Sequence, residues 1–309
     1  MLPLRFVFTA LLLFPLAQDG RPEFLRWSAE DLSERNGALS TRMRSDQSAR
    51  ETLAEYGNPS GAHRIRFIRH DADGVAEQHV GIEDVVFVQS GSGSVVVGGD
   101  LVGRTGGTGE YTGTDIEGGV EYAVGAGDVI HIPADVPHRY LVPDGGHVTY
   151  VIVRLPALTE AVVPDDAPVL TFDPPGFAIW SESELRNRHV VLTGQLRPDR
   201  SARETLADFG SPTRSHRFRY IHRDADGVPE IHDDIIDLVF VKSGAGMVVV
   251  GGEMLNRRGS LGSGIAGGTE YPVAAGDVLH IPAKTPHGYL IPDGGHITYV
   301  LVRVPAFFR

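Results

Sequence analysis

The chain has 309 residues, of which 41% are hydrophobic and 22% are charged, and its formal net charge at pH 7 is −12. This composition predicts packed globular cores, and the negative charge argues against a nucleic-acid partner because phosphate groups would be repelled. The absence of cysteine excludes disulfides, thiolate metal ligands and a cysteine nucleophile.

The first residues have the layout of a secretory signal. Arg5 precedes an apolar run over residues 6–16, and small and polar residues follow it from Ala17 to Gly20. The run is too short to span a bilayer, so a permanent membrane anchor is the weaker interpretation. We expect residues 1–17 to be removed, which would leave a secreted or periplasmic protein with no stable membrane span.

The rest of the chain is an internal duplication. Trp27-Ser28 recurs as Trp180-Ser181, a shift of 153 residues, and the segment 127–157 matches 276–306 at 23 of 31 positions with a shift of 149. Prolines and acidic residues between the copies indicate an extended connector. The predicted organisation is one domain over 25–157, a linker over 158–177 and a second domain over 178–306.

Each copy contains a serine and a glutamate at capping-box spacing, Ser48 and Glu51 in the first and Ser201 and Glu204 in the second. This spacing predicts a short lead-in helix in each copy. Short runs rich in β-branched and aromatic residues follow, separated by Gly, Asp and Pro. These runs predict strands, so each copy is expected to be a small antiparallel barrel or jelly roll in an all-β protein.

A glycine-rich segment lies inside each copy, at Gly103 to Gly119 and at Gly259 to Gly268. Neither contains the Gly-Lys-Ser/Thr element of a nucleotide loop. We expect loops near the barrel mouth, with plain surface hairpins favoured over lids.

Two motifs in each copy resemble those of the cupin superfamily. The first is Glu77-x-His79-x4-Asp84-x6-Gly91, and the second is Gly127-Asp128-x4-Pro133-x4-His138. The resemblance to a bicupin implies two tandem double-stranded β-helix barrels with one divalent metal ion in each. The implied ligands are Glu77, His79, Asp84 and His138 in the first copy, and Glu230, His232, Asp237 and His287 in the second.

The residues themselves also indicate a metal site. Side chains at i and i+2 on a strand share a face, so Glu77 and His79 should converge. Carboxylate and imidazole donors suit Fe, Mn, Zn or Ni as divalent ions. The family has histidine at the Glu77 position and the longer glutamate at Asp84; if Asp84 is too short, Glu77, His79 and His138 remain as a set that favours iron. The alternative is that recent duplication alone has matched ordinary polar residues.

Other paired residues are candidates for catalysis and substrate binding. His131 and His280 lie seven residues before the last ligand of each set and are candidate acid–base groups, or else core histidines. A hairpin turn at Asp73-Gly74 would pair residues 63–70 with the strand of Glu77 and place arginines beside the metal, where they could hold an anion. These arginines are Arg64 and Arg66, with Arg217 and Arg219 in the second copy; the alternative is that they are solvated.

The resemblance implies a metal-dependent enzyme of dioxygenase, decarboxylase or isomerase type that acts on a small oxygen-rich or anionic molecule. The alternative is a non-catalytic cupin that binds or stores a metal or a small ligand, because a fold does not fix a function. The sequence leaves the substrate, the metal and the oligomeric state open, including a homo-oligomer.

Overall fold

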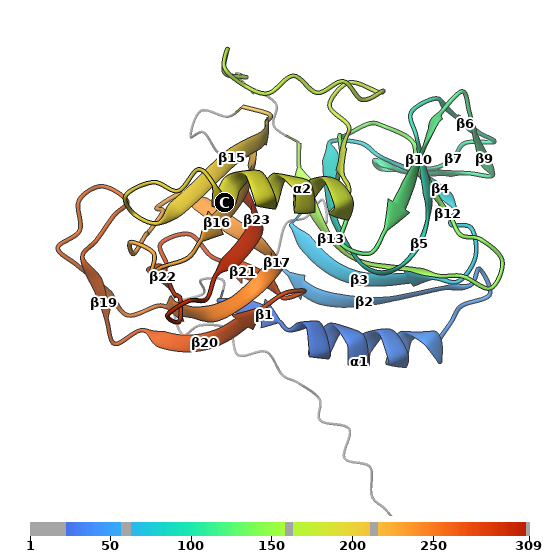
Figure 1. Ribbon diagram of the computed structural model, residues 1–309. Coiled ribbons are helices and arrows are strands. Elements are labelled where there is room, and N and C mark those ends of the chain that lie inside the picture. The colour runs from blue at the N-terminus through green and yellow to red at the C-terminus, as the bar shows by residue number, and fades with distance from the viewer. Residues whose placement is uncertain (1–22, 57–62, 158–162, 211–215, 307–309) are drawn as a thin grey trace, which may run out of the picture.

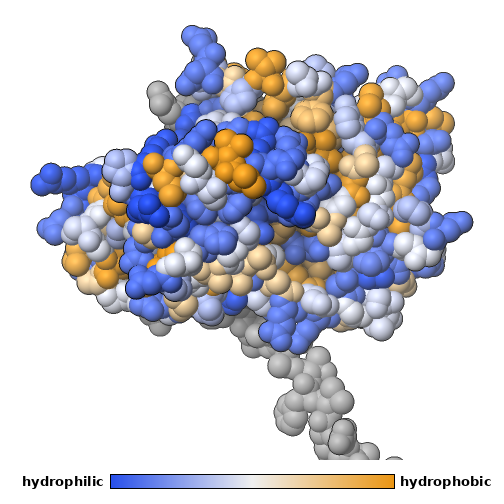
Figure 2. Space-filling view, in the orientation of Figure 1, coloured by the Kyte–Doolittle hydropathy of each residue, from blue (hydrophilic) through white to orange (hydrophobic). Residues whose placement is uncertain are grey.

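A computed structural model describes residues 23–56, 63–157, 163–210 and 216–306, which form two β-barrels side by side (Figure 1). The expected all-β fold with tandem jelly rolls is confirmed. The predicted signal, residues 1–17, lies outside the described residues. Within the described ranges, no helix is long and apolar enough to cross a membrane. The face in Figure 2 carries hydrophobic side chains in small groups among hydrophilic ones.

Both barrels are built from short antiparallel strands around one long strand. Barrel 1 contains β2 (Ser48–Glu55), β3 (Arg64–His70), β4 (Ala76–His79), β5 (Ile82–Val97), β6 (Asp100–Val102), β7 (Thr105–Gly107), β8 (Glu110–Gly113), β9 (Asp115–Glu117), β10 (Val120–Gly125), β11 (Val129–Ile132), β12 (His138–Leu141) and β13 (Val148–Pro156). Barrel 2 contains β15 (Ser201–Asp208), β16 (Arg217–Arg223), β17 (Ile235–Val250), β18 (Glu253–Leu255), β19 (Gly264–Ala266), β20 (Thr269–Ala274), β21 (Val278–Ile281), β22 (His287–Leu290) and β23 (Ile297–Pro305).

The long strand β5 contributes to both sheets of barrel 1. Its first half pairs with β11 and β13, and its second half pairs with β10 and β12. Between the halves Gly91 has a φ of 78°, and a Cβ there would lie 1.8 Å from the carbonyl oxygen of His147. Only glycine fits this position, and Gly244 repeats it in β17 with a φ of 77°.

Alternation along the strands divides the apolar residues between two kinds of core. Val86 and Val88 face the inside of barrel 1 and pack in one cluster with Ile152. Phe87 faces the other way, into a core shared by the two barrels, where its ring centroid lies 4.9 Å from that of Phe240. The barrels are therefore joined by a hydrophobic interface.

The first strand of each copy pairs with the other copy's barrel. The strand β1 (Leu25–Trp27) pairs with β21, and β14 (Ala178–Trp180) pairs with β11. The helices that follow, α1 (Ala29–Ser40) and α2 (Glu182–Thr193), return to their own barrels and contact β2 and β15 respectively. This reciprocal exchange interlocks the two halves (Figure 1).

The capping-box prediction is wrong about where the helices lie. Ser48 and Ser201 begin strands β2 and β15, and the Ser48 hydroxyl bonds the Asp46 carboxylate instead of capping a helix. Helices begin after Ser28 and Ser181, whose hydroxyls accept the backbone N–H of Asp31 and Glu184. Alternating burial in β2 and its pairing with β3 outweigh the local capping signal.

The predicted hairpin at Asp73-Gly74 is also wrong. The strand β3 pairs with β2 and β13, while β4, which carries Glu77, pairs with β12 and β8. The glycine-rich segments contain hairpin strands, namely β7, β8 and β9 in the first copy and β19 in the second.

Candidate functional site

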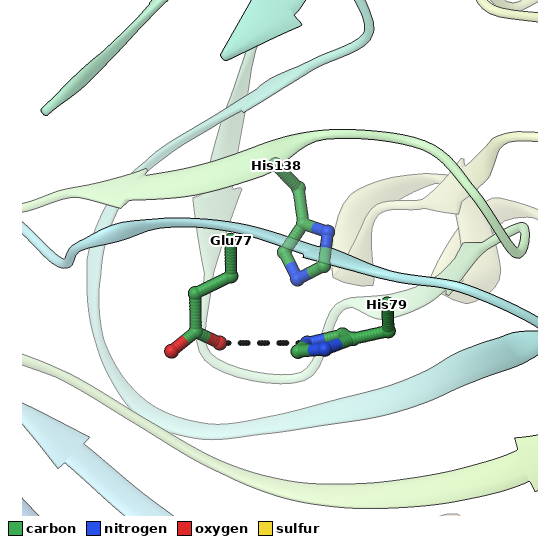
Figure 3. Close-up of side chains that lie close together, drawn as sticks. All are labelled: Glu77, His79 and His138. Atoms are coloured by element: carbon green, nitrogen blue, oxygen red, sulfur yellow. Dashed lines mark ion pairs between the residues drawn. The ribbon is translucent and has the colours of Figure 1, made fainter. Parts of the chain in front are cut away.

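Three predicted metal ligands meet inside barrel 1 (Figure 3). Glu77 and His79 project from β4 to the same side, and His138 lies on β12, directly across the ladder from Glu77. One ligand atom from each side chain lies within 4.8 Å of the other two, and the Glu77 carboxylate is 3.4 Å from His79 Nε2. Both histidines are buried.

The shorter side chain of Asp84 still reaches this group. Its Oδ2 lies 3.8 Å from His79 Nε2 and 3.6 Å from His138 Nε2. The side chain is 1% exposed, and neither carboxylate oxygen has a hydrogen-bond partner. A buried carboxylate without such partners is costly, and a bound cation would satisfy both oxygens.

Hydrogen bonds on the outer nitrogens aim both imidazoles at the centre. The Nδ1–H of His138 donates to the carbonyl of Val136 at 3.1 Å, and the Nδ1–H of His79 donates to the Glu110 carboxylate at 2.7 Å. In the neutral rings these tautomers leave the Nε2 lone pairs facing inward, which is the arrangement of a metal-ligating histidine with its outer partner.

Glu110 was not predicted from the sequence. It begins β8 in the glycine-rich segment, and the shorter second copy has no equivalent because the repeat shift changes there. The sequence does not set Glu110 apart, because Asp115 and Glu117 lie in the same glycine-rich segment.

A buried arginine also occupies the centre of barrel 1. Nη2 of Arg154, on β13, lies 2.6 Å from Nε2 of His79, and its Nε lies 3.5 Å from Oδ1 of Asp84. Burial opposes protonation of His79, but hydrogen bonds to Glu110 and Glu77 outweigh it and raise the pKa of His79 to about 9. A proton, the guanidinium and a metal ion would therefore compete for one lone pair.

The donor set in barrel 1 fits a divalent cation. Three carboxylates, those of Glu77, Asp84 and Glu110, surround the single guanidinium of Arg154. Burial raises the pKa of Glu77, but the hydrogen bond from His79 and nearby positive charges lower it to about 2. Glu77, His79, Asp84 and His138 would hold the ion.

Barrel 2 repeats the ligands with a different charge balance. Glu230, His232 and His287 form a second group whose ligand atoms lie within 4.8 Å of one another, and Asp237 Oδ2 is 3.3 Å from His287 Nε2. Here two guanidiniums offset the two carboxylates, because Arg303 lies 2.9 Å from Glu230, and Arg223, at the position of His70 in barrel 1, lies 3.8 Å from it. This group has less surplus negative charge for a cation.

Arginines without carboxylate partners line the pocket of each barrel. Arg50 and Arg66 line the pocket beside Glu77 in barrel 1, and Arg203 and Arg219 line that of barrel 2. Among the described residues, none of the four guanidinium groups forms a hydrogen bond or ion pair. The cavity volume is about 80 Å³ in barrel 1 and about 380 Å³ in barrel 2. These pockets offer unpaired positive charge to an anionic ligand.

The structure does not bring the other two predicted arginines into the pockets. Arg64 and Arg217 share a strand face with Arg66 and Arg219, but they lie at the strand ends. There they form ion pairs with Glu55 and Asp208.

No protein-family model matches the sequence, and no curated protein is significantly similar to it. Solved structures do match. A salicylate 1,2-dioxygenase from Pseudaminobacter salicylatoxidans aligns with 93% of this chain and 86% of its own, at 12% identity and a TM-score of 0.56. A Pseudomonas aeruginosa protein described as glyoxylate-induced aligns with 85% of this chain and 83% of its own, at 15% identity and a TM-score of 0.50. The chain has the bicupin fold.

The predicted acid–base histidines lie outside the barrel cavities of this bicupin. His131 is on β11 with Val129, whose side chain packs into the core between the barrels, while Ile132 on the opposite face lines the pocket. The hydrogen-bond partners of His131 are the Gly176 carbonyl and the Glu83 carboxylate. His280 lies on the matching face of β21 and contacts Tyr56 and His63. Both histidines are therefore interface residues, and neither lines a barrel pocket.

Proposed function

We propose that this bicupin is a metal-dependent enzyme whose substrate is a small anionic molecule, with the principal metal centre in barrel 1. A divalent ion held by Glu77, His79, Asp84 and His138 would act as a Lewis acid toward a substrate oxygen, or as a redox centre if it is iron or manganese. The surplus of carboxylates in barrel 1 supports that placement.

The observation that carries the proposal is the pair of unpaired guanidiniums beside the ligand group. Arg66 is half-buried, and burial together with the positive charges of Arg154, Arg64 and Arg50 lowers its pKa to about 10. It therefore stays protonated near neutral pH. A carboxylate bound between Arg50 and Arg66 would relieve this repulsion, and guanidiniums can hold a carboxylate through two parallel hydrogen bonds.

Tyr140 adds a hydrogen-bond donor to the same pocket. Its hydroxyl is buried without a hydrogen-bond partner. Burial and the charges of Asp84 and Glu77 raise its pKa far above the usual value, so the hydroxyl keeps its proton. It would orient an oxygen of a substrate whose carboxylate is held by Arg66, and the buried donor would then be satisfied.

A structural neighbour agrees with this substrate class. The salicylate 1,2-dioxygenase is named for a small aromatic carboxylate. At 12% identity this likeness extends only to the fold, so dioxygenation, decarboxylation and isomerisation all stay within the proposal, and the bound metal decides among them.

One observation favours a second candidate, a cupin that binds an anion without turnover. In both barrels an arginine Nη2 contacts a ligand histidine, with Arg154 at 2.6 Å from His79 and Arg303 at 2.8 Å from His232. If these contacts persist in solution, the guanidiniums replace the metal and the pockets act as anion receptors.

The two candidates are separated by measuring metal and anion binding in the same protein. We expect natively purified protein to contain a stoichiometric transition metal that His138→Ala removes from barrel 1. Benzoate, used as a probe carboxylate, should bind with an affinity that Arg66→Ala lowers by about 10-fold or more, the loss of one charge-assisted contact. Arg64→Ala, whose guanidinium already pairs with Glu55, is the matched control.

Metal-free protein that binds benzoate and takes up no added Fe(II), Mn(II), Zn(II) or Ni(II) would overturn the enzyme proposal in favour of the receptor. Given bound metal, oxygen uptake and carbon dioxide release with a panel of small carboxylates would then identify the reaction class.

A further inference from the structure

We propose a third divalent-cation site, formed between the barrels by Glu83 and His131 of the first copy and His216 of the second. One ligand atom from each residue lies within 4.8 Å of the other two. A carboxylate and two imidazoles are suitable donors for Zn(II) or Co(II). This site goes beyond the proposed activity, because it shares no ligand with either barrel centre.

The distances match shared coordination. Glu83 Oε2 is 2.9 Å from His216 Nε2 and 3.3 Å from His131 Nε2. Two donor atoms bound to one zinc ion in tetrahedral geometry lie about 3.4 Å apart, given metal–ligand bonds of about 2.1 Å. A small adjustment of side chains would admit an ion between the three atoms.

The tautomer of His131 supports the site independently. Its Nδ1–H donates to the backbone carbonyl of Gly176 at 2.8 Å, so in the neutral ring the Nε2 lone pair faces the Glu83 carboxylate. Two electron-rich groups that face each other in a buried place repel each other unless a proton or a metal ion lies between them, and the titration below tests for the metal ion. A backbone carbonyl on the outer nitrogen is also the usual partner of a metal-bound histidine.

His216 supplies a second sign of a missing partner. It is 2% exposed, and neither of its ring nitrogens has a hydrogen-bond partner with acceptable geometry, although Glu83 is near. Among the described residues, no lysine or arginine pairs with Glu83. The cluster therefore differs from the barrel centres, where a guanidinium already compensates the carboxylates.

The other half of the interface provides a built-in comparison. Its pseudo-symmetric cluster keeps both histidines, as His63 and His280, but has Ile236 at the position of Glu83. There the His280 Nδ1 contacts the hydroxyl of Tyr56 at 3.1 Å. In the Glu83 cluster the position of Tyr56 is occupied by Phe209, which has no hydroxyl. Two imidazoles without a carboxylate are a poor divalent site, so we assign the ion to the Glu83 cluster alone.

The test uses the full-length chain with both barrel centres disabled by His138→Ala and His287→Ala, together with Glu77→Gln and Glu230→Gln. After dialysis against Zn(II) and then against metal-free buffer, we expect this variant to retain one equivalent of zinc per chain, measured by elemental analysis. Co(II) should give the absorption spectrum of a histidine- and carboxylate-bound ion. The thermal midpoint should rise with added Zn(II).

Adding Glu83→Ile, which copies the mirror cluster, should remove the retained zinc and the zinc-dependent rise in thermal midpoint. Glu83→Gln makes the same test with less change in shape, and circular dichroism reports whether each variant folds. His63→Gln in the mirror cluster should leave the retained equivalent intact. The site is refuted if the barrel-disabled protein binds no zinc, or if its zinc is indifferent to Glu83→Gln. Because each barrel centre has lost two of its four ligands and the readout is zinc bound through Glu83, neither outcome depends on the proposed enzyme activity.

Discussion

Nη2 of Arg154 lies 2.6 Å from Nε2 of His79, the atom that would bind a metal in barrel 1. The same relationship recurs between Arg303 and His232 at 2.8 Å. In each barrel, an arginine guanidinium thus occupies the position from which a metal ion would bind the histidine Nε2. Metal binding must displace this guanidinium, and the carboxylates around it determine what that displacement costs.

Arg154→Met should strengthen metal binding in barrel 1. Methionine has a similar length and no charge, so the ion would no longer compete with a guanidinium or be repelled by it. Repulsion between neighbouring cations at a partly buried site costs at least about 1 kcal/mol, which predicts an affinity gain of about 5-fold or more. Isothermal titration of metal-free protein with Mn(II) measures it.

Arg66→Met is the control, since this guanidinium lines the pocket but makes no hydrogen bond or ion pair with the ligand group. Arg66→Met should raise the metal affinity less than Arg154→Met does. Weaker metal binding in Arg154→Met would mean that the arginine supports the ion instead of competing with it.

Glu110→Gln should weaken the metal centre of barrel 1 and spare that of barrel 2. The carboxylate accepts the Nδ1–H of His79 at 2.7 Å, and loss of such an outer partner typically costs about 10–100-fold in metal affinity. His232 has no equivalent glutamate, so barrel 2 serves as a control inside the same molecule. Equal losses in both barrels, measured by metal titration, would contradict this role.

Asp277→Ala should destabilise the fold without touching either pocket. The Asp277 carboxylate is 2% exposed; it accepts the backbone N–H of Ala29 at 2.9 Å and the guanidinium of Arg26 at 3.0 Å. It therefore fastens the exchanged N-terminal segment onto barrel 2. Losing these contacts should lower the free energy of unfolding by about 2 kcal/mol.

Urea denaturation with a two-state fit measures the loss, and Asp144→Ala, an exposed turn residue, is the control. A denaturation midpoint equal to that of the unaltered protein would show that the exchanged strand does not depend on this carboxylate.

The duplication, the strands and most ligands could be predicted from the sequence because each depends on local spacing. Glu77 and His79 share a face by the two-residue period of a strand, and the second motif places His138 across from them. The capping boxes misled because a local helix signal is weak against the burial of Ala49 and Leu53 on a paired strand.

The residues that were missed or misplaced depend on long-range pairing. The strand β11 is buried on both faces. Its sequence therefore does not tell whether His131 or Ile132 points into the barrel. Arg154 reaches the centre only because β13 lies between β3 and β5. Glu110 arrives through the β7–β8 hairpin, which is shortened in the second copy to the single pair Arg258 and Leu261.

The free energy of unfolding should decrease as the pH is lowered, because His63 becomes protonated. Burial lowers the pKa of His63 to about 4, against 6.5 for a free side chain, because its neighbours are the buried ring of His280 at 3.3 Å and the stacked ring of Tyr56. Between pH 6.5 and 4, the unfolded chain therefore binds a proton at His63 that the folded chain does not bind. The contribution of His63 is complete above pH 6.5, and it declines as pH falls toward 4 by up to about 3 kcal/mol. Urea midpoints between pH 7.5 and 4 measure the decline. It should be smaller in His63→Gln, whose side chain does not titrate, and an unchanged decline would show that other groups govern acid stability.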